Sequence, residues 1–415
     1  MAERVVIERL GARGDGVVET ASGSLHVPYA LPGESASIER EGARGRIAAI
    51  ETASPDRVEP FCPYFGTCGG CAAQHMGPGL YRAWKQGIVA GALAQAGIAI
   101  VPDNLIDAHG EGRRRITLHA RYATGQAQVG YMAARSHDLI EIARCPIAEP
   151  ALAGAPSAAS ALAGALARSK KPLDLQVTNS EAGLDIDIRG HGPIDERERQ
   201  ALVETAGALD LARLSLHGEV VVERRPPTHR MGPARVTPPP GGFLQATREG
   251  EERLAEIVIS ACGQARRVVD LFAGCGPFAL RLAESREVHA VESYAAALSA
   301  LDRAARATPG LRRVTIEARD LFRRPLLAPE LDRFEAVVID PPRAGAEAQA
   351  KQLAISRVPL VASVSCDAGT FARDAALLIA GGYGLERVAL VDQFKFSPHV
   401  ELVGLFRRPT SKRRR

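Results

Sequence analysis

Short β-prone apolar runs alternate with helix-length stretches from about residue 245 to the C-terminal end of the chain. The runs are RVVDLF, EVHAVE, VTIEARD, FEAVVID and VASVS. Strands that alternate with helices predict a doubly wound sheet, in which ligands bind beyond the carboxyl ends of the strands. We therefore predict an α/β fold for residues 241–415, with a reactive edge where these runs end.

The fifth run, VASVS, ends at a thiol. Cys366 follows it directly, and Gly369 and a helical stretch from Thr370 come next. A thiol at the carboxyl end of a parallel strand would point into the ligand crevice. The alternative is a buried cysteine that acts as a small hydrophobe, which is the common fate of a free cysteine.

A glycine-containing turn, DLFAGCG, follows the first run, and Glu292 at the end of the second run stands 22 residues after Asp270. This spacing suits a carboxylate that binds ribose hydroxyls. The turn lacks the Gly-x-Gly-x-x-Gly pattern of a pyrophosphate cradle and is similar to the first motif of class I methyltransferases. A purely structural tight turn is the alternative.

Two further strand ends carry carboxylates. Asp320 ends the third run and would face an adenine or its neighbourhood, and Asp340 ends the fourth, before Pro341, Pro342 and Arg343. The prolines restrict the backbone at the strand exit. Amino-methylating enzymes typically have an aromatic residue after Asp-Pro-Pro, so the arginine here indicates another chemistry.

Residues 1–56 alternate short β-prone runs with Gly, Asp and Pro turns, which predicts a five-stranded barrel of the OB type. This segment resembles the TRAM domain, an RNA-binding module of RNA-modifying enzymes. A small barrel with only a structural role is the alternative.

Cys62, Cys68 and Cys71 stand at Cys-x5-Cys-x2-Cys spacing, and antiparallel strands are expected to bring Cys145 back towards them. A cluster of this sort in the cytosol favours metal binding over disulfides. Four thiolates suit either tetrahedral zinc or an iron–sulfur cluster. Residues 57–240 otherwise predict an α+β central domain, which a proline-rich stretch separates from the C-terminal domain.

The composition excludes some classes of protein. No apolar run is long enough to span a membrane, and the charged start MAERVVIERL lacks a signal-peptide core, so we expect a cytoplasmic protein. A net charge of +4 is mild, but arginine clusters such as 113–115 could meet phosphates.

Together these pieces resemble the class I RNA uracil-5-methyltransferases, a family with 23S rRNA and tRNA members. The resemblance covers nearly the whole chain: the TRAM-like barrel, the four cysteines, GGFLQ, DLFAGCG, DPPRAG, SCD and HVE. It implies that Cys62, Cys68, Cys71 and Cys145 hold a [4Fe–4S] cluster, with zinc the less favoured alternative. It also implies an RNA substrate, with 23S rRNA favoured over tRNA. The sequence carries no signal for oligomeric state, and a monomer is the default expectation.

The same resemblance implies roles for single residues. Cys366 would be the nucleophile and Glu401 the general base. Carbon 5 of uracil is a weak nucleophile, and addition of a thiolate to carbon 6 makes it reactive; this is covalent catalysis. We expect this thiolate to be accessible near neutral pH. The S-adenosylmethionine-binding positions would be Gln245, Phe272, Glu292, Asp320 and Asp340.

The chain departs from the family pattern in three places. Pro277 stands where a smaller or amide residue is usual, Asp367 and Ala368 replace Asn-Pro, and Thr247 replaces a common Asn. None of these changes removes a catalytic group. Two rival hypotheses are an RNA-binding or ribosome-assembly factor that no longer reacts, and a methyltransferase for amines or small molecules.

Overall fold

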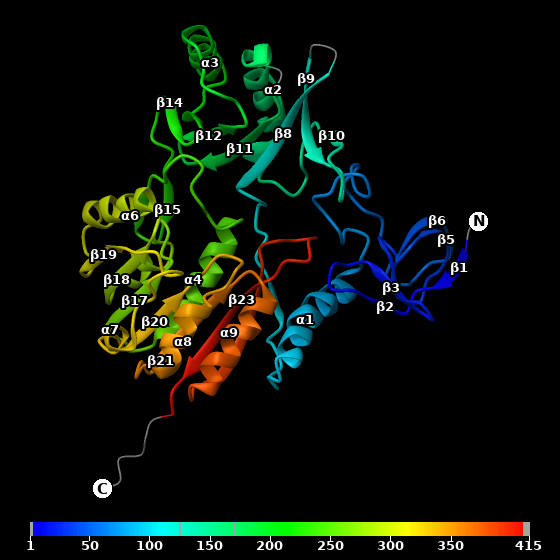
Figure 1. The fold of residues 1–415 in the computed structure, drawn as a ribbon. Helices are drawn as coiled ribbons and strands as arrows, with labels where there is room; N and C mark the ends of the chain where they lie inside the picture. Colours follow the sequence, from blue (N-terminus) through cyan, green and yellow to red (C-terminus); the bar gives the residue numbers. More distant parts are fainter. Residues whose placement is uncertain (1–2, 124–125, 170, 410–415) are drawn as a thin grey trace.

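The computed structural model describes residues 3–123, 126–169 and 171–409. Its strands fall into three large sheets, which form three lobes (Figure 1). The N-terminal lobe lies on one side of the molecule, the middle of the chain forms a lobe at one end, and the C-terminal lobe packs against both.

The N-terminal lobe is a barrel-like sheet that has, among the described residues, six strands in the order β1-β5-β6-β4-β3-β2. The sequence predicted five; the sixth is a two-residue strand, too short to show any pattern. The core of the lobe includes Leu25, Val27 and Ile38. The strands are β1 (Glu3–Val6), β2 (Arg9–Leu10), β3 (Gly16–Thr20), β4 (Gly23–Val27), β5 (Ser35–Glu41) and β6 (Arg44–Thr52).

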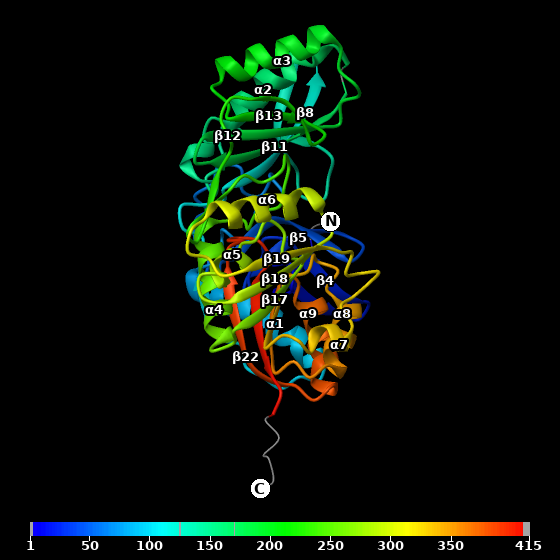
Figure 2. The same ribbon diagram turned by 90° about the vertical axis from the view of Figure 1, so that its left-hand side faces the viewer.

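The middle lobe is a mostly antiparallel sheet covered by helices α2 (Ala155–Ala165) and α3 (Glu196–Ala208) (Figure 2). Its described strands follow the order β10-β9-β8-β11-β12-β13-β14, and only β12 and β13 pair in parallel. They are β8 (Arg115–Ala123), β9 (Gln126–Met132), β10 (Leu139–Glu141), β11 (Leu173–Ser180), β12 (Gly183–Arg189), β13 (Arg213–Leu216) and β14 (Glu219–Glu223). Two 3-10 turns, η1 (Pro150–Leu152) and η2 (Ala167–Ser169), flank α2.

The C-terminal lobe confirms the predicted α/β fold. In the part of the chain that the structure describes, its sheet has the order β19-β18-β17-β20-β21-β23-β22-β7. Strand β23 alone runs antiparallel to its neighbours β21 and β22. The strands are β17 (Arg267–Leu271), β18 (Glu287–Glu292), β19 (Val314–Ala318), β20 (Ala336–Ile339), β21 (Leu360–Ser365), β22 (Gly384–Asp392), β23 (Glu401–Arg407) and β7 (Leu105–Asp107).

Helices cover both faces of this sheet, so its central strands are buried on both sides and read as continuous apolar runs. One face packs against α1 (Pro78–Gln95), α8 (Glu347–Ile355) and α9 (Ala368–Ala380). The other packs against α4 (Arg248–Cys262), α5 (Ala279–Leu282) and α6 (Ala295–Ala307). A short helix, α7 (Ala328–Leu331), and a hairpin of β15 (His229–Met231) and β16 (Ala234–Val236) complete the lobe.

Two elements from the middle of the chain belong to this C-terminal sheet. Strand β7 pairs in parallel with β22, and Val89 and Leu93 of α1 lie in the same core as α9. The division of the chain at residues 56 and 240 remains a prediction. Within the described residues, no helix combines the length and the apolar character that a membrane span needs.

Candidate active site and cysteine-lined cavity

Three predicted site residues meet at one edge of the C-terminal sheet. Cys366 follows the last residue of β21, and Asp340 follows the last residue of β20. Strand β23 runs antiparallel to β21, with Leu402 opposite Ser365, so its first residue, Glu401, lies at the same edge. The reversed strand is therefore what brings a carboxylate from the end of the chain to the thiol.

A chain of hydrogen bonds joins the two carboxyls beneath the thiol. The Gln245 amide donates to Asp340 Oδ2 at 3.1 Å. The amide of Gln393 donates to Gln245 Oε1 at 2.7 Å and to Glu401 Oε1 at 3.1 Å. The other oxygen, Glu401 Oε2, is buried and has no hydrogen-bond partner among the described residues. One face of this carboxyl is thus held, and the other is available.

Burial and mutual repulsion raise the pKa of the acids in this site. The pKa of Asp340 is raised by burial, and the pKa of Glu401 is raised by burial and then by the Asp340 charge. The pKa of the Cys366 thiol is raised to about 11, first by burial and then by Glu401 and Asp340, with Arg343 acting in the opposite direction. The expectation of a readily accessible thiolate is therefore wrong for the free protein, because the sequence alone does not show these two carboxyls beside the sulfur.

Cys366 lines a groove of about 790 Å³ between lobes. The groove is bounded by Arg9 and its neighbours in the N-terminal lobe, by the Leu80 to Gln95 face of α1, and by Pro398 and His399. The ring of His399 is 3.0 Å from the Arg343 guanidinium, which places a cation at the rim. The thiol can therefore be reached from outside the protein, whereas the carboxyls lie behind it.

The cofactor positions expected from the sequence lie at the exits of β17, β18 and β19. Glu292 Oε2 accepts a hydrogen bond from the Gly274 amide at 3.0 Å, so the acid and the glycine turn are in contact. Phe272 has a φ of +62°, which is strained for a residue with a side chain, and such strain concentrates at functional sites. Its ring lies 5.4 Å from that of Phe322.

Asp320 lies at the same edge of the sheet. Its Oδ1 accepts the Phe322 amide at 3.0 Å, which fixes the turn that carries this exposed ring. Pro277, where the sequence departs from the family, uses its carbonyl oxygen to accept a hydrogen bond from Arg281 at 2.7 Å.

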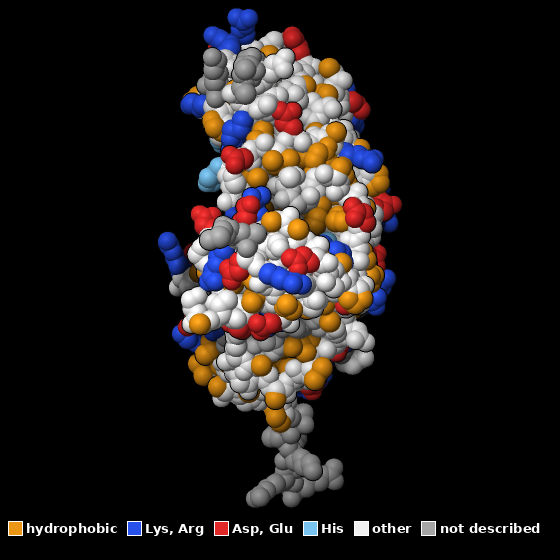
Figure 3. Space-filling view, turned by 90° about the vertical axis from the view of Figure 1, so that its right-hand side faces the viewer, with side chains coloured by type: hydrophobic (Ala, Val, Ile, Leu, Met, Phe, Trp, Pro, Cys, Tyr) orange, Lys and Arg blue, Asp and Glu red, His pale blue; other side chains and the backbone are white. Residues whose placement is uncertain are grey.

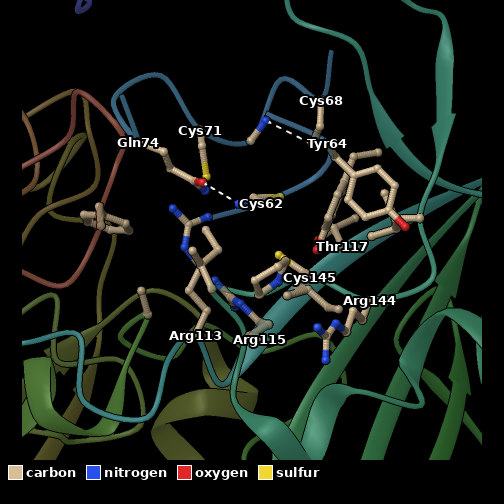
Figure 4. A pocket seen from close by; sticks show the side chains of 18 of the residues that line it. Cys62, Tyr64, Cys68, Cys71, Gln74, Arg113, Arg115, Thr117, Arg144 and Cys145 are labelled. Atoms are coloured by element: carbon tan, nitrogen blue, oxygen red, sulfur yellow. Dashed lines mark hydrogen bonds between the residues drawn. The ribbon is translucent and has the colours of Figure 1, made fainter. Parts of the chain in front are cut away.

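The second feature is a cavity of about 380 Å³ between the middle lobe and the segment at 62–74. Cys62, Cys68, Cys71 and Cys145 all line it, and Arg113 and Arg115 extend towards them (Figure 4). The four cysteines form no disulfide. Among the described residues, no three His, Cys, Asp or Glu side chains are placed as ligands of a single metal ion.

The backbone around these cysteines is held by nearby polar groups. The Cys62 amide donates to Gln74 Oε1 at 3.2 Å, and the Gly70 amide donates to Cys68 Sγ at 3.4 Å. Burial raises the pKa of the Cys71 thiol to about 12 and raises that of Cys68. Burial thus favours the uncharged form of these two thiols.

Sequence reasoning missed several residues of the active site. Gln393 lies at the end of the apolar run VALVD, and a polar amide at a strand end was the available signal. His399 precedes Glu401 by two residues, and the sequence analysis used it only as part of the HVE motif. Lys85, on α1, gave no signal, because an isolated lysine on a helix normally faces solvent.

Comparison with known proteins gives a consistent picture. Residues 235–408 match the family described as tRNA (Uracil-5-)-methyltransferase. An uncharacterized RNA methyltransferase of Mesorhizobium japonicum is 46% identical over 413 residues, which cover 100% of both chains. The 23S rRNA (uracil(1939)-C(5))-methyltransferase RlmD of Halomonas elongata is 33% identical over 452 residues, covering 99% of this chain and 90% of that protein.

The solved structures show a protein of the same fold. The tRNA (uracil-54, C5)-methyltransferase of Pyrococcus abyssi, in complex with S-adenosyl-L-homocysteine, superposes with a TM-score of 0.74. The match covers 97% of this chain and 100% of that one, at 19% sequence identity. At this identity the likeness concerns the fold alone.

Proposed function

This chain belongs to the RNA (uracil-5-)-methyltransferase family, and on that premise we propose that it methylates carbon 5 of one uridine in 23S rRNA, with Cys366 as covalent nucleophile and Glu401 as general base. The observation that carries the proposal is the position of Cys366. Its thiol lines an open groove, beside the buried carboxyl of Glu401 and the half-buried carboxyl of Asp340. The small-molecule hypothesis is thereby set aside.

The chemistry assigns one task to each group. The Cys366 thiolate forms a bond to carbon 6 of the uracil, and the ring becomes an enolate with electron density on carbon 5. S-adenosylmethionine supplies the electrophilic methyl group that carbon 5 takes up. Glu401 then accepts the proton from carbon 5, the carbon 5–carbon 6 double bond re-forms, and the sulfur leaves with its bonding pair. Cys366 regains a proton, so the enzyme is regenerated.

The environment of Glu401 suits this task. A general base works best when its pKa lies near the working pH, and burial with the nearby Asp340 charge raises the pKa of Glu401 towards that range. The free oxygen Oε2 offers a lone pair, while Oε1 is held by Gln393. We assign the methyl donor to the edge formed by Gln245, Phe272 and Glu292, together with Asp320 and Asp340.

For the cysteine-lined cavity we propose a [4Fe–4S] cluster held by Cys62, Cys68, Cys71 and Cys145. Tetrahedral zinc, with Zn–S distances of about 2.3 Å, is the alternative group that four thiolates could hold. Four thiols around a larger cavity suit a larger group. Such a cluster would join the 62–71 segment to the middle lobe.

We assign the RNA to the groove beside Cys366 and to the N-terminal lobe. Arginines on this lobe pair with acids, as in Arg9 with Glu19 and Arg46 with Glu39. Figure 3 shows basic and acidic side chains interspersed over the side of the molecule that it faces, without one continuous basic patch. The 23S rRNA is favoured by the Halomonas relative, and tRNA is the alternative that the family description suggests.

The test compares the wild-type enzyme with Cys366→Ala, Glu401→Gln and a matched control, Cys262→Ala. Cys262 is buried on α4 and contacts no proposed site residue. Unmodified 23S rRNA fragments and tRNA transcripts receive labelled methyl groups from S-adenosylmethionine, and mass spectrometry locates 5-methyluridine.

We expect methyl transfer to 23S rRNA by the wild type and the control, none by Cys366→Ala, and a covalent methylated RNA complex with Glu401→Gln. Undiminished methylation by Cys366→Ala would overturn the mechanism. Methylation of tRNA alone would overturn the assigned substrate, and cofactor binding without transfer to either RNA would favour an assembly factor.

A further inference from the structure

The loop that joins β22 to β23, residues 393–400, carries active-site groups at both ends. Gln393, its first residue, donates to Glu401 Oε1, and Glu401 begins the strand that follows the loop. His399, near its other end, is in contact with Arg343 at 3.0 Å. The conformation of this loop therefore determines where Gln393 and the Glu401 carboxyl lie.

A buried lysine from a distant helix holds this loop. Lys85 of α1 is 0% exposed. Its ammonium group lies 2.9 Å from Asp392 Oδ1, 3.3 Å from the Phe394 carbonyl oxygen and 2.5 Å from the His399 carbonyl oxygen. A lysine ammonium has three N–H donors, so each of them has a partner here. The three acceptors span the loop from the end of β22 to within two residues of Glu401.

Tyr81 adds a second contact, one helical turn before Lys85. Its hydroxyl donates to Asp392 Oδ2 at 2.6 Å and accepts a hydrogen bond from the Phe396 amide at 2.9 Å. Side chains four residues apart lie on the same face of a helix, so one face of α1 contacts the loop at its start, middle and end. The same helix packs on α9 through its core residues and has little freedom to shift.

A contribution to folding stability does not by itself explain why Lys85 is buried with Asp392. Taking both charges of a pair out of water costs several kcal/mol per ion, and well-packed apolar residues of similar volume are often as stable or more so. Lys85 and Asp392 are both nearly inaccessible to water. What apolar residues could not supply is the set of directed bonds to two backbone carbonyls of an irregular loop.

We propose that Lys85, assisted by Tyr81, is a positioning residue that fixes the 393–400 loop and so places Gln393 and Glu401 for removal of the carbon 5 proton. This inference rests on the proposed function. It does not involve Cys366, which lies in a different connection, between β21 and α9. Loss of Lys85 therefore affects the second half of the reaction, proton removal and release, more than the addition of the thiol.

The experiment separates thiol addition and methyl transfer from removal of the carbon 5 proton and release of the RNA. RNA with 5-fluorouridine at the target has no carbon 5 proton to lose, so its covalent capture reports addition and methyl transfer alone. Turnover of normal RNA also requires proton removal. Lys85→Met is compared with the wild type and with Leu93→Ala, a matched control in which a buried residue of α1 loses apolar packing but no side-chain hydrogen bond to the loop.

For Lys85→Met we expect 5-fluorouridine capture at a rate close to the wild type. We expect turnover of normal RNA to fall by about 100-fold, the cost of a misplacement of about 1 Å, with methylated RNA accumulating on the enzyme. Tyr81→Phe should show a smaller change in the same direction, and it serves as the test if Lys85→Met does not fold.

Equal losses of capture and turnover, as expected for Leu93→Ala, would overturn the inference, and so would unchanged turnover in both variants. Failure of the wild type to capture 5-fluorouridine RNA would instead overturn the proposed function, so the two failures are distinguishable.

Discussion

Gln393 offers a sharp test of the site because a single side chain joins its parts. Its Oε1 accepts the Ala246 amide at 2.9 Å, and its amide nitrogen donates to Gln245 and to Glu401. Gln393→Met keeps the length of the side chain and removes all three hydrogen bonds. The Glu401 carboxyl would then lose the Gln393 hydrogen bond that stabilises its charged form.

The size of the effect follows from that bond. A hydrogen bond to a charged group contributes about 1.5–3 kcal/mol, and each 1.36 kcal/mol corresponds to about one pKa unit. The pKa of Glu401 should therefore rise by about 1–2 units in Gln393→Met. Because the carboxylate is the active base, the release step would need a correspondingly higher pH, and the ascending limb of its pH profile would move upwards.

The assay is single-turnover release of methylated RNA from the covalent complex, measured across the pH range. The control is Gln349→Met. Gln349 lies on α8, away from the thiol, and is 0% exposed. Its two side-chain hydrogen bonds go to the main chain of Leu326. An ascending limb that stays in place in Gln393→Met, or moves equally in the control, would refute the role of this hydrogen bond.

Two further predictions concern stability. Glu251 is buried between Arg114 and Arg281, so Arg114→Met leaves this carboxylate with one of its two ion partners. It should lower the free energy of unfolding by about 1.5–3 kcal/mol in urea titrations, and a loss below about 0.5 kcal/mol would contradict this. The pKa of Glu401 is higher in the folded protein than the ordinary value of 4.5, so the folded state binds this proton more tightly than the unfolded state does. The contribution of Glu401 to the free energy of unfolding therefore declines as pH rises from 4.5 through the raised pKa. Glu401→Gln should therefore gain stability relative to the wild type between pH 5 and pH 8, and parallel urea midpoints at these two pH values would contradict the raised pKa.

Much of the C-terminal lobe could be predicted from the sequence. Its central strands are buried on both faces, so each of them appears in the sequence as a separate apolar run. The five predicted runs all lie in this sheet as strands, whereas its strand order and its reversed strand β23 are seen only in the structure. Strand β7 could not be predicted, because three residues have no period, and its place depends on pairing with β22 almost 300 residues later. The two-residue strand β2 is likewise too short to be predicted from a sequence pattern.

In the candidate site, too, some residues could be predicted from local sequence and others could not. Residues at strand ends, such as Cys366 and Asp340, could be found because a parallel sheet collects its strand ends at one edge. The partners that hold the site in place could not, since they act across large sequence distances. Lys85 and Asp392 are 307 residues apart, and nothing near Lys85 in the sequence distinguishes it from a solvated lysine.

The raised pKa of Cys366 imposes an order on the reaction. With a pKa of about 11, about one thiol in 10⁴ is ionised at pH 7, which corresponds to about 5.5 kcal/mol. A specific RNA complex with a dissociation constant of about 10 nM releases about 11 kcal/mol, so RNA binding is large enough to meet this cost. The burial that prepares Glu401 as a base therefore also keeps the sulfur protonated, and unreactive towards other electrophiles, until a pyrimidine fills the groove. On the proposed function, ionisation of Cys366 is therefore expected to follow binding of the RNA.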